Sequence, residues 1–313
     1  MKTHKEIYLG AQKLATSFDE VNGTEVKIDG ETYYKITNYD AMRPFFMSIV
    51  SNSNHWMFIS STGGLTAGRK NSNFALFPYY TDDKLTESSE TTGSKTLCLV
   101  SRSGKTSLWE PFSTRYGGVY DLSRNLYKNS FGNKVKFEEV NHDLGLTFSY
   151  EWNSSDKFGF VRNSALINHG SEAVSVEFID GLQNLLPYGV EDALQNASSN
   201  LVDAYKKCEL ETSVGLGLFS LSAIIVDKAE PSEALRSNVA WSLGRPNAIK
   251  LLSSKQLNAF RKGESPKQEV DIKAERGAYM ICDTVELDAN ASEHWSILAD
   301  VNKGPLEVAD LMA

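Results

Sequence analysis

The chain has 313 residues, of which 41% are hydrophobic and 23% are charged, and these shares are typical of a globular protein with a sizeable core. Its formal net charge of -8 argues against a nucleic-acid-binding surface, because phosphate binding needs clustered Lys and Arg and none stand out. The longest apolar stretch, residues 214–226, is too short for a membrane span and is interrupted by Gly and Ser, so no membrane partner is expected.

The N-terminal residues and the cysteines predict a compartment. Residues 1–15 (MKTHKEIYLGAQKLA) lack the continuous apolar core of a signal peptide. Cys98, Cys208 and Cys282 are odd in number and form no CxxC pair, so they are interpreted as buried free thiols. We therefore predict a reducing, cytoplasmic location.

The first part of the chain predicts an arm followed by short strands. Ile7, Ala11, Leu14 and Phe18 fall at helical spacing, so residues 1–30 are predicted to hold a helical arm, with a strand packed on a sheet as the alternative. Short strands are then expected at residues 33–37, 45–50 and 56–60.

Two long polar segments are predicted to be irregular. Residues 61–73 (STGGLTAGRKNSN) are interpreted as a Gly-rich surface loop, because the GxxxxGK[ST] pattern is absent and no helix pattern follows. Arg69 in this segment leaves an anion contact open. Residues 109–133 contain Trp109 and Tyr116 among Gly and Arg residues, and such aromatic loops either pack on a sheet or bind a ligand.

Residues 158–190 form the clearest fold marker. A strand at residues 161–167, a turn at residues 168–171 (NHGS) and a second strand alternating from Val174 predict a β-hairpin, with His169 exposed in its turn. Residues 180–184 (DGLQN) are interpreted as a polar corner directly after this hairpin. Its Gln183 and Asn184 either contact a ligand or brace the junction with the next helix.

The remaining elements predict the fold class. Residues 190–204 form one amphipathic helix pattern and residues 254–263 a short surface helix. Further strands are expected at residues 97–101, 135–140, 144–152, 216–226, 241–243, 270–274, 279–287 and 295–301. Because strands recur at short intervals without βαβ alternation, we predict a mainly β fold: a large antiparallel sandwich with a few short helices.

The sequence contains no familiar catalytic constellation. There is no GxSxG motif, the histidines never occur at HxxxH or HExxH spacing, and no metal site or cofactor is predicted. His55 and Trp56 begin a strand, and a sugar site would use such a pair, but the structural interpretation is preferred, because an isolated His near an aromatic residue usually packs. Paired acids at residues 138–139, 191–192 and 227–233 are not expected to form a complete glycosidase pair.

The hairpin resembles a known family. Residues 161–177 (VRNSALINHGSEAVSVE) resemble a strand pair in the N-terminal β-supersandwich of cellobiose-phosphorylase-like (glycosyltransferase 36-type) enzymes, within the galactose-mutarotase-like superfamily. Residues 295–301 (WSILADV) resemble the last sheet strand of such domains. The resemblance implies one β-supersandwich domain over residues 1–313, forming the N-terminal part of a longer protein. In that family a helical (α/α)6 barrel follows and carries the general acid.

The resemblance also implies a function. It favours a non-catalytic accessory domain of a glycoside phosphorylase or hydrolase, which packs on a C-terminal helical catalytic domain and contributes to a sugar site or a homodimer contact. The alternatives are a stand-alone mutarotase-like sugar epimerase and a structural β-sandwich without a small-molecule ligand. His169 is followed by Gly-Ser-Glu instead of the sugar-binding segment of aldose epimerases, so no epimerase catalytic residue is assigned. The candidate carbohydrate-binding residues are His55, Trp56, Arg69, Trp109, Arg115, Tyr116, Gln183, Asn184 and Tyr188.

Overall fold

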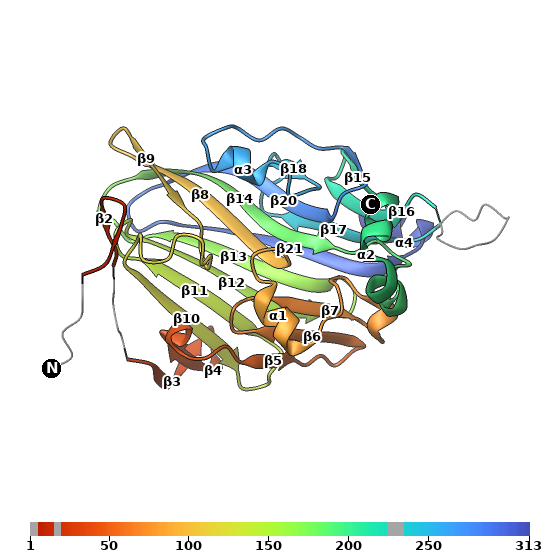
Figure 1. Cartoon of the computed structure of the whole chain (residues 1–313), viewed down its shortest axis with the longest axis horizontal. Coiled ribbons are helices and arrows are strands. Elements are labelled where there is room, and N and C mark those ends of the chain that lie inside the picture. Colours follow the sequence, from red (N-terminus) through yellow and green to blue (C-terminus); the bar gives the residue numbers. More distant parts are fainter. Residues whose placement is uncertain (1–5, 16–19, 224–234) are drawn as a thin grey trace.

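The computed structural model describes residues 6–15, 20–223 and 235–313, except for the side chains of residues 82 and 197–200, and consists mainly of antiparallel sheets (Figure 1). The largest sheet has eleven strands in the order β19-β15-β16-β17-β21-β13-β12-β11-β10-β4-β3. In chain order its strands are β3 (Asn22–Ile28), β4 (Glu31–Thr37), β10 (Leu122–Asn129), β11 (Val135–Asn141), β12 (Leu146–Ser155), β13 (Gly159–Asn168), β15 (Lys206–Glu211), β16 (Leu216–Leu221), β17 (Ser237–Leu243), β19 (Asp271–Lys273) and β21 (Ser292–Lys303).

Two smaller sheets accompany the large one. The five-stranded sheet has the order β18-β20-β14-β8-β9, and the three-stranded sheet has the order β5-β6-β7. Their strands are β5 (Phe46–Ile49), β6 (His55–Ser60), β7 (Leu65–Arg69), β8 (Gly93–Arg102), β9 (Lys105–Trp109), β14 (Val174–Leu185), β18 (Ile249–Leu251) and β20 (Gly277–Leu287). A short hairpin of β1 (Tyr8–Leu9) and β2 (Gln12–Lys13) forms a two-stranded sheet of its own, and Gln12 donates to the Val119 carbonyl.

The core lies where the smaller sheets face the large sheet. Phe178 on β14 stacks on Trp295 of β21 with ring centroids 4.5 Å apart, and Phe77 meets Trp152 of β12 edge-on at 6.4 Å. All four rings are almost fully buried. Burying such large apolar side chains is the main favourable contribution to folding, and it fixes which face of β14 points inward.

In the described residues four α-helices lie at the periphery: α1 (Asp82–Glu87), α2 (Asp192–Tyr205), α3 (Leu257–Phe260) and α4 (Pro305–Met312). Leu257 and Phe260 of α3 cover the outer face of the five-stranded sheet, where they pack with Ile179 and Met280 in a second apolar cluster. The five-stranded sheet is therefore buried on both faces over much of its length. No helix in the described ranges is long and apolar enough to cross a membrane.

The structure confirms the predicted class, since the fold is mainly β with large antiparallel sheets and few short helices. The two strands predicted around residues 168–171, which are β13 and β14, and the helix at residues 190–204, which is α2, are also confirmed. The predicted β-hairpin is wrong, because β13 pairs with β12 and β21 in the large sheet while β14 pairs with β8 and β20 in the five-stranded sheet, so the turn connects two sheets. His169, in the turn between β13 and β14, is exposed, as predicted. Cys98, Cys208 and Cys282 are all buried and free, as predicted from their number and spacing.

Four further local predictions are wrong in the described residues. Strands β1, β2 and β3 replace the predicted arm helix, while Phe18 lies outside the described residues. Residues 61–73 are not a surface loop, because they contain β7, whose Leu65 and Ala67 are fully buried. Residues 109–133 contain strand β10. Finally, residues 180–184 are no corner but the buried end of β14 itself.

Candidate functional site

The candidate site is centred on the C-terminal end of β14. The register of β14 against β20 shifts between Gln183 and Leu185, so Asn184 is an extra residue in a β-bulge and adopts a left-handed φ of 59°. Such bulges redirect side chains and often occur next to functional sites. The Asn184 amide donates to Thr92 Oγ1 at 2.9 Å. Residues 183 and 184, which the sequence singled out, therefore lie at this bulge, and the corner that was predicted for them is wrong.

Small residues beside Gln183 leave room above the sheet. Gln183 pairs with Gly93 on β8 and with Ala278 on β20, so neither neighbouring strand places a large side chain beside it. Gln183 is on the outer face of the sheet, like Ile179, because side chains alternate along a strand. The space over the sheet at this end is consequently open to a ligand.

The amide of Gln183 has no hydrogen-bond partner on its nitrogen, although the residue is only 3% exposed. A buried donor that is left unpaired costs about 1 to 3 kcal/mol, so most such groups are satisfied. Other buried polar atoms among the described residues lack partners too, for example Trp152 Nε1. Gln183, however, is the one of them that lines a cavity on this face.

A charged network forms one wall of the site. Lys95, which pairs with Gly181 across β8 and β14, contacts both Glu90, at 2.6 Å, and Glu110. Arg261 after α3 donates to both oxygens of Glu110, at 2.9 and 2.8 Å. These pairs tie the segment after β9 and the end of α3 to the sheet, and so fix the shape of the wall.

The acids of this network are held ionised. Burial alone would raise the pKa of Glu90, but the Lys95 ammonium and hydrogen bonds from Thr114 and Ser113 lower it to about 2. Burial would also raise the pKa of Glu110, but Arg261 and Lys95 outweigh this effect and hold the pKa below its ordinary value. Neither carboxyl is therefore protonated at neutral pH, and neither can donate a proton there.

Two adjoining cavities make up the site. The first, of about 450 Å³, is lined by Gln183 and by the basic residues Lys95, Arg115, Lys255 and Arg276. The second, of about 230 Å³, shares three lining residues with the first: Asn184, Asp203 and Arg276. We call the two cavities together the β14 groove. Its volume falls in the range of small-molecule sites.

Two tyrosines line the second cavity. Tyr79 is 41% exposed, and Tyr80 follows it directly. Trp56 packs edge-on against the Tyr79 ring, with centroids 5.7 Å apart. The groove thus joins an aromatic end to an end that is lined by amide and charged groups. Trp56, one of the predicted site residues, therefore contacts a ring of this aromatic end but is not among the groove-lining residues.

The other predicted site residues are divided among different places. Arg115 lines the groove with Gln183 and Asn184, and Tyr116 lies near enough to Arg261 to influence its pKa. Trp109 is only 1% exposed and donates to Glu139 in the core, so its ring is not available to a ligand. Tyr188 is half-buried and is not among the groove-lining residues.

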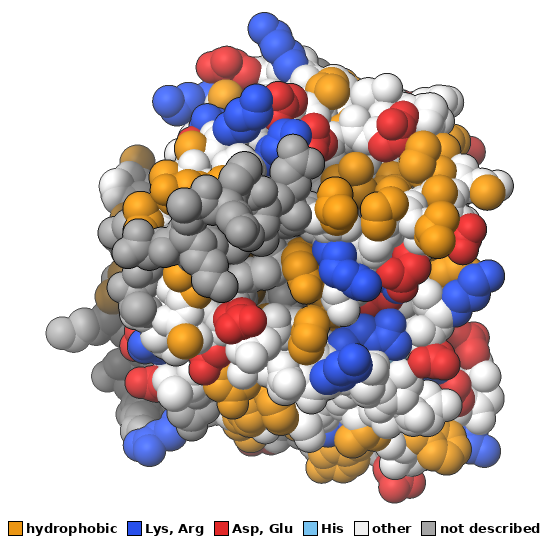
Figure 2. Space-filling view, turned by 90° about the vertical axis from the view of Figure 1, so that its right-hand side faces the viewer, with side chains coloured by type: hydrophobic (Ala, Val, Ile, Leu, Met, Phe, Trp, Pro, Cys, Tyr) orange, Lys and Arg blue, Asp and Glu red, His pale blue; other side chains and the backbone are white. Residues whose placement is uncertain are grey.

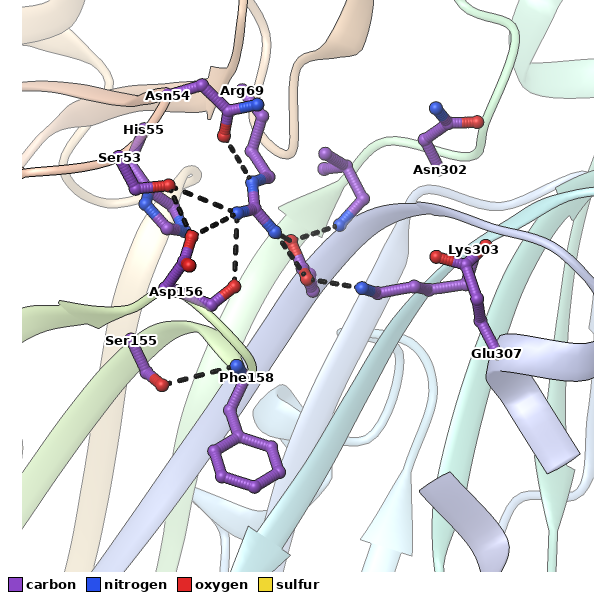
Figure 3. Close-up of polar contacts among 12 residues, drawn as sticks. Ser53, Asn54, His55, Arg69, Ser155, Asp156, Phe158, Asn302, Lys303 and Glu307 are labelled. Carbon is purple, nitrogen blue, oxygen red and sulfur yellow. Dashed lines mark hydrogen bonds and ion pairs between the residues drawn. The ribbon is translucent and has the colours of Figure 1, made fainter. Parts of the chain in front are cut away.

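Arg69 and His55 belong to a separate polar cluster (Figure 3). Arg69 donates to Asn54 at 2.7 Å and to the fully buried Asp300 at 3.0 Å, and Lys303 contacts the same carboxylate at 2.7 Å. These contacts join β7 to the end of β21. Burial, with a smaller effect of Arg69, lowers the pKa of His55. The cluster satisfies its own charges, which is the pattern of a structural link between sheets.

Sequence reasoning missed part of the groove. Lys255, Arg276, Tyr79 and Tyr80 come from segments that are far apart in the chain, and no motif joins them. The neighbouring tyrosines after Pro78 were the one local signal, because two adjacent aromatic residues in a polar connection often serve binding.

Comparisons with known proteins give fold likenesses. No family model matches the sequence. No curated protein matches it either. Among solved structures, the chain is similar to a polysaccharide lyase, with 11% identity, a TM-score of 0.46 and coverage of 86% of this chain and 34% of that chain. It is similar to a bacterial glucoamylase complexed with acarbose, with 8% identity, a TM-score of 0.46 and coverage of 95% and 36%.

A third similar structure is a galactose mutarotase-like protein from Lactobacillus casei, with 10% identity, a TM-score of 0.43 and coverage of 82% of this chain and 100% of that chain. This chain spans about a third of the length of the lyase and the glucoamylase. At such identities and TM-scores the likenesses concern the general arrangement of the sheets, and they do not assign a ligand or an activity to this chain.

Proposed function

We propose that this chain binds carbohydrate in the β14 groove as a non-catalytic domain of a carbohydrate-active enzyme. The observation that carries the proposal is the buried, unpartnered amide of Gln183 on the floor of a groove with exposed Tyr79 at its other end. A sugar presents hydroxyl groups at its edge and C–H groups on its faces. Hydroxyl oxygens suit the free amide, and C–H groups suit the electron-rich face of an aromatic ring.

The acids of the groove support binding rather than catalysis. Glycoside hydrolysis needs a carboxylic acid that stays protonated near neutral pH, beside a second carboxylate. The pKa of Glu90 is instead lowered to about 2, and Asp203 and Glu275 are ion-paired with Lys206 and Lys255. No His is among the described groove-lining residues, and a sugar epimerase of the mutarotase type would need one.

The partner that we propose is the helical catalytic domain of a glycoside phosphorylase or hydrolase, as in cellobiose-phosphorylase-like enzymes. Helix α4 is the side proposed for docking, because its Leu306 is 82% exposed. Figure 2 looks at the side that is on the right in Figure 1 and shows hydrophobic side chains in several groups among charged ones. The alternative is that a second copy of this chain docks on this face. Light scattering of the wild type and of Leu306→Glu tests it, because a homodimer held by this face would dissociate in the variant.

Titration with a panel of neutral and acidic mono- and oligosaccharides, at up to millimolar concentration, tests the binding proposal. Because Trp56 contacts Tyr79, occupation of the groove is expected to change tryptophan fluorescence, and calorimetry measures the same binding without a probe. The Trp56→Phe variant should lose most of the fluorescence change but keep the calorimetric signal. Absence of binding for every sugar would leave the structural β-sandwich without a small-molecule ligand as the better account.

A further inference from the structure

Basic side chains dominate the open part of the Gln183 end of the groove. Lys255 and Arg276 expose 54% and 58% of their side chains, and Arg115 is exposed as well. The acidic residues beside them, Asp203 and Glu275, expose only 27% and 38%. This local excess of cations is opposite in sign to the net charge of the whole chain, which is -8. Such a patch attracts anions.

The guanidinium groups of Arg115 and Arg276 have donors that are not used by strong contacts within the protein. Arg115 makes no ion pair with any described residue. Arg276 lies 3.5 Å from Asp203, but that carboxylate has a closer partner in Lys206 at 2.7 Å. Arg presents its donors as a planar fork that matches a carboxylate, so both side chains are suited to a bidentate anion contact.

The third donor is the amide nitrogen of Gln183, which needs an acceptor and has none in the protein. The residue Gln183 lines the same cavity of about 450 Å³ as Arg115 and Arg276. The buried Lys95 in this wall is not available to bind an anionic ligand, because its ammonium group already contacts both Glu90 and Glu110. The three groups named here, on Arg115, Arg276 and Gln183, are therefore all donors, and two of them are positively charged.

We propose that the Gln183 end of the groove binds the carboxylate of an acidic sugar, so that the ligand is an oligosaccharide containing uronic acid. The proposal rests on carbohydrate binding in the groove and specifies its class. Arg115 and Arg276 pair with the carboxylate oxygens, and Gln183 donates to an oxygen of the same ring. The neighbouring ring of the oligosaccharide packs on Tyr79 in the second cavity.

Calorimetry with galacturonic acid trisaccharide and with the matching neutral galactose trisaccharide tests this proposal. At low ionic strength the acidic trisaccharide is expected to bind about tenfold more tightly, and added salt should reduce this difference by screening. Replacement of Arg115 and Arg276 together by Gln should lower the affinity for the acidic sugar by about tenfold and leave that for the neutral sugar within about twofold. Lys262→Gln is the matched control, because this exposed lysine follows α3 but does not line the groove.

The outcomes separate the two proposals. Equal binding of the acidic and the neutral trisaccharide, without a salt effect, overturns the uronic-acid assignment and leaves carbohydrate binding intact. Preference for a galactose 6-sulfate over the uronic acid also overturns it, because the anion is then a sulfate. If neither trisaccharide nor any other sugar binds, carbohydrate binding itself fails. Equal losses in the double variant and in Lys262→Gln would show a general charge effect and overturn the site.

Discussion

Strand β14 carries two polar groups, three residues apart, that face opposite sides of one sheet. On the inner face, the buried carboxylate of Asp180 accepts hydrogen bonds from Thr96, from both Nη atoms of Arg162, from Ser164 and from Trp295, at 2.6 to 3.1 Å. On the outer face, the Gln183 amide is equally buried but has an unpartnered nitrogen.

The difference separates a structural role from a binding role. Asp180 and Arg162 join the five-stranded sheet to the large sheet, and every donor around the carboxylate is provided by the protein. Such a network holds one arrangement of the core and leaves nothing for a ligand. Gln183 instead lines the β14 groove, and we propose that a ligand in the groove supplies the missing hydrogen bond. The variants below test this contrast, in order of decreasing effect.

Asp180→Asn should be the most damaging change. It leaves the guanidinium of Arg162, which is fully buried, without its counter-charge, and the free energy of unfolding should fall by about 3 to 5 kcal/mol. Urea denaturation measures it. Asp156→Asn is the control, because this side chain is 80% exposed beside Arg69, and its loss should cost less than about 1 kcal/mol. Equal effects in the two variants would contradict the structural role of the inner network.

Glu90→Gln should destabilise the protein in a pH-dependent way. The pKa of Glu90 is lowered from 4.5 to about 2 in the folded protein, so its ionised form stabilises the fold above pH 4.5, and this contribution is lost as the pH falls toward 2. The variant should be about 2 kcal/mol less stable at pH 7, and its deficit should shrink between pH 4.5 and 2. Denaturation curves over this pH range measure the loss, and Glu264→Gln, at an exposed position, is the control. A loss of stability in Glu90→Gln that did not depend on pH would contradict the ion pair with Lys95.

Gln183→Leu should affect binding and stability in opposite ways. Removing an unpartnered buried amide should leave the free energy of unfolding unchanged or slightly higher, while the affinity for the sugar falls by about tenfold. Calorimetry and urea denaturation on the same preparation test both parts. A clear loss of stability with unchanged affinity would mean that Gln183 only braces the end of β14.

Tyr79→Ala should have the smallest effect. Loss of the exposed ring should weaken sugar binding by about fivefold and change stability by less than about 1 kcal/mol, since Tyr79 is 41% exposed. Tyr8→Ala removes a ring that is 55% exposed outside the groove and should leave binding unchanged. Equal affinities of the two variants would remove the aromatic end from the site.

The fold could be predicted from the sequence where side chains alternate regularly. The strand pattern from Leu146 to Trp152 predicted β12, because each apolar residue in it faces the core. The Gly-rich segment around Leu65 was predicted to be a loop, because its small and polar residues do not show the pattern of a strand. It is in fact a strand that is buried on both faces. Thr147 and Ser149 of β12 are buried as well, so what made β12 recognisable is the alternation of large apolar and small polar side chains, which β7 lacks.

The groove could be predicted only in part. Gln183 and Asn184 stood out as polar residues after a hydrophobic strand, yet the corner expected there does not exist, since β14 continues and bulges. Trp109 was a plausible sugar-binding ring by type, but it is buried beside Glu139. Which polar side chain lacks a partner depends on contacts between distant segments, such as Gly93 beside Gln183, and single-sequence patterns do not report these contacts.

The central claim is that the Gln183 amide receives its missing hydrogen bond from a bound sugar. The side-chain amide resonances of Gln183 in ¹H–¹⁵N NMR spectra, assigned by their absence in Gln183→Leu, report this bond directly. During titration with galacturonic acid trisaccharide, these resonances should shift in a saturable manner, with the same affinity that calorimetry gives. Saturable binding that leaves them unmoved would place the sugar elsewhere and contradict the account.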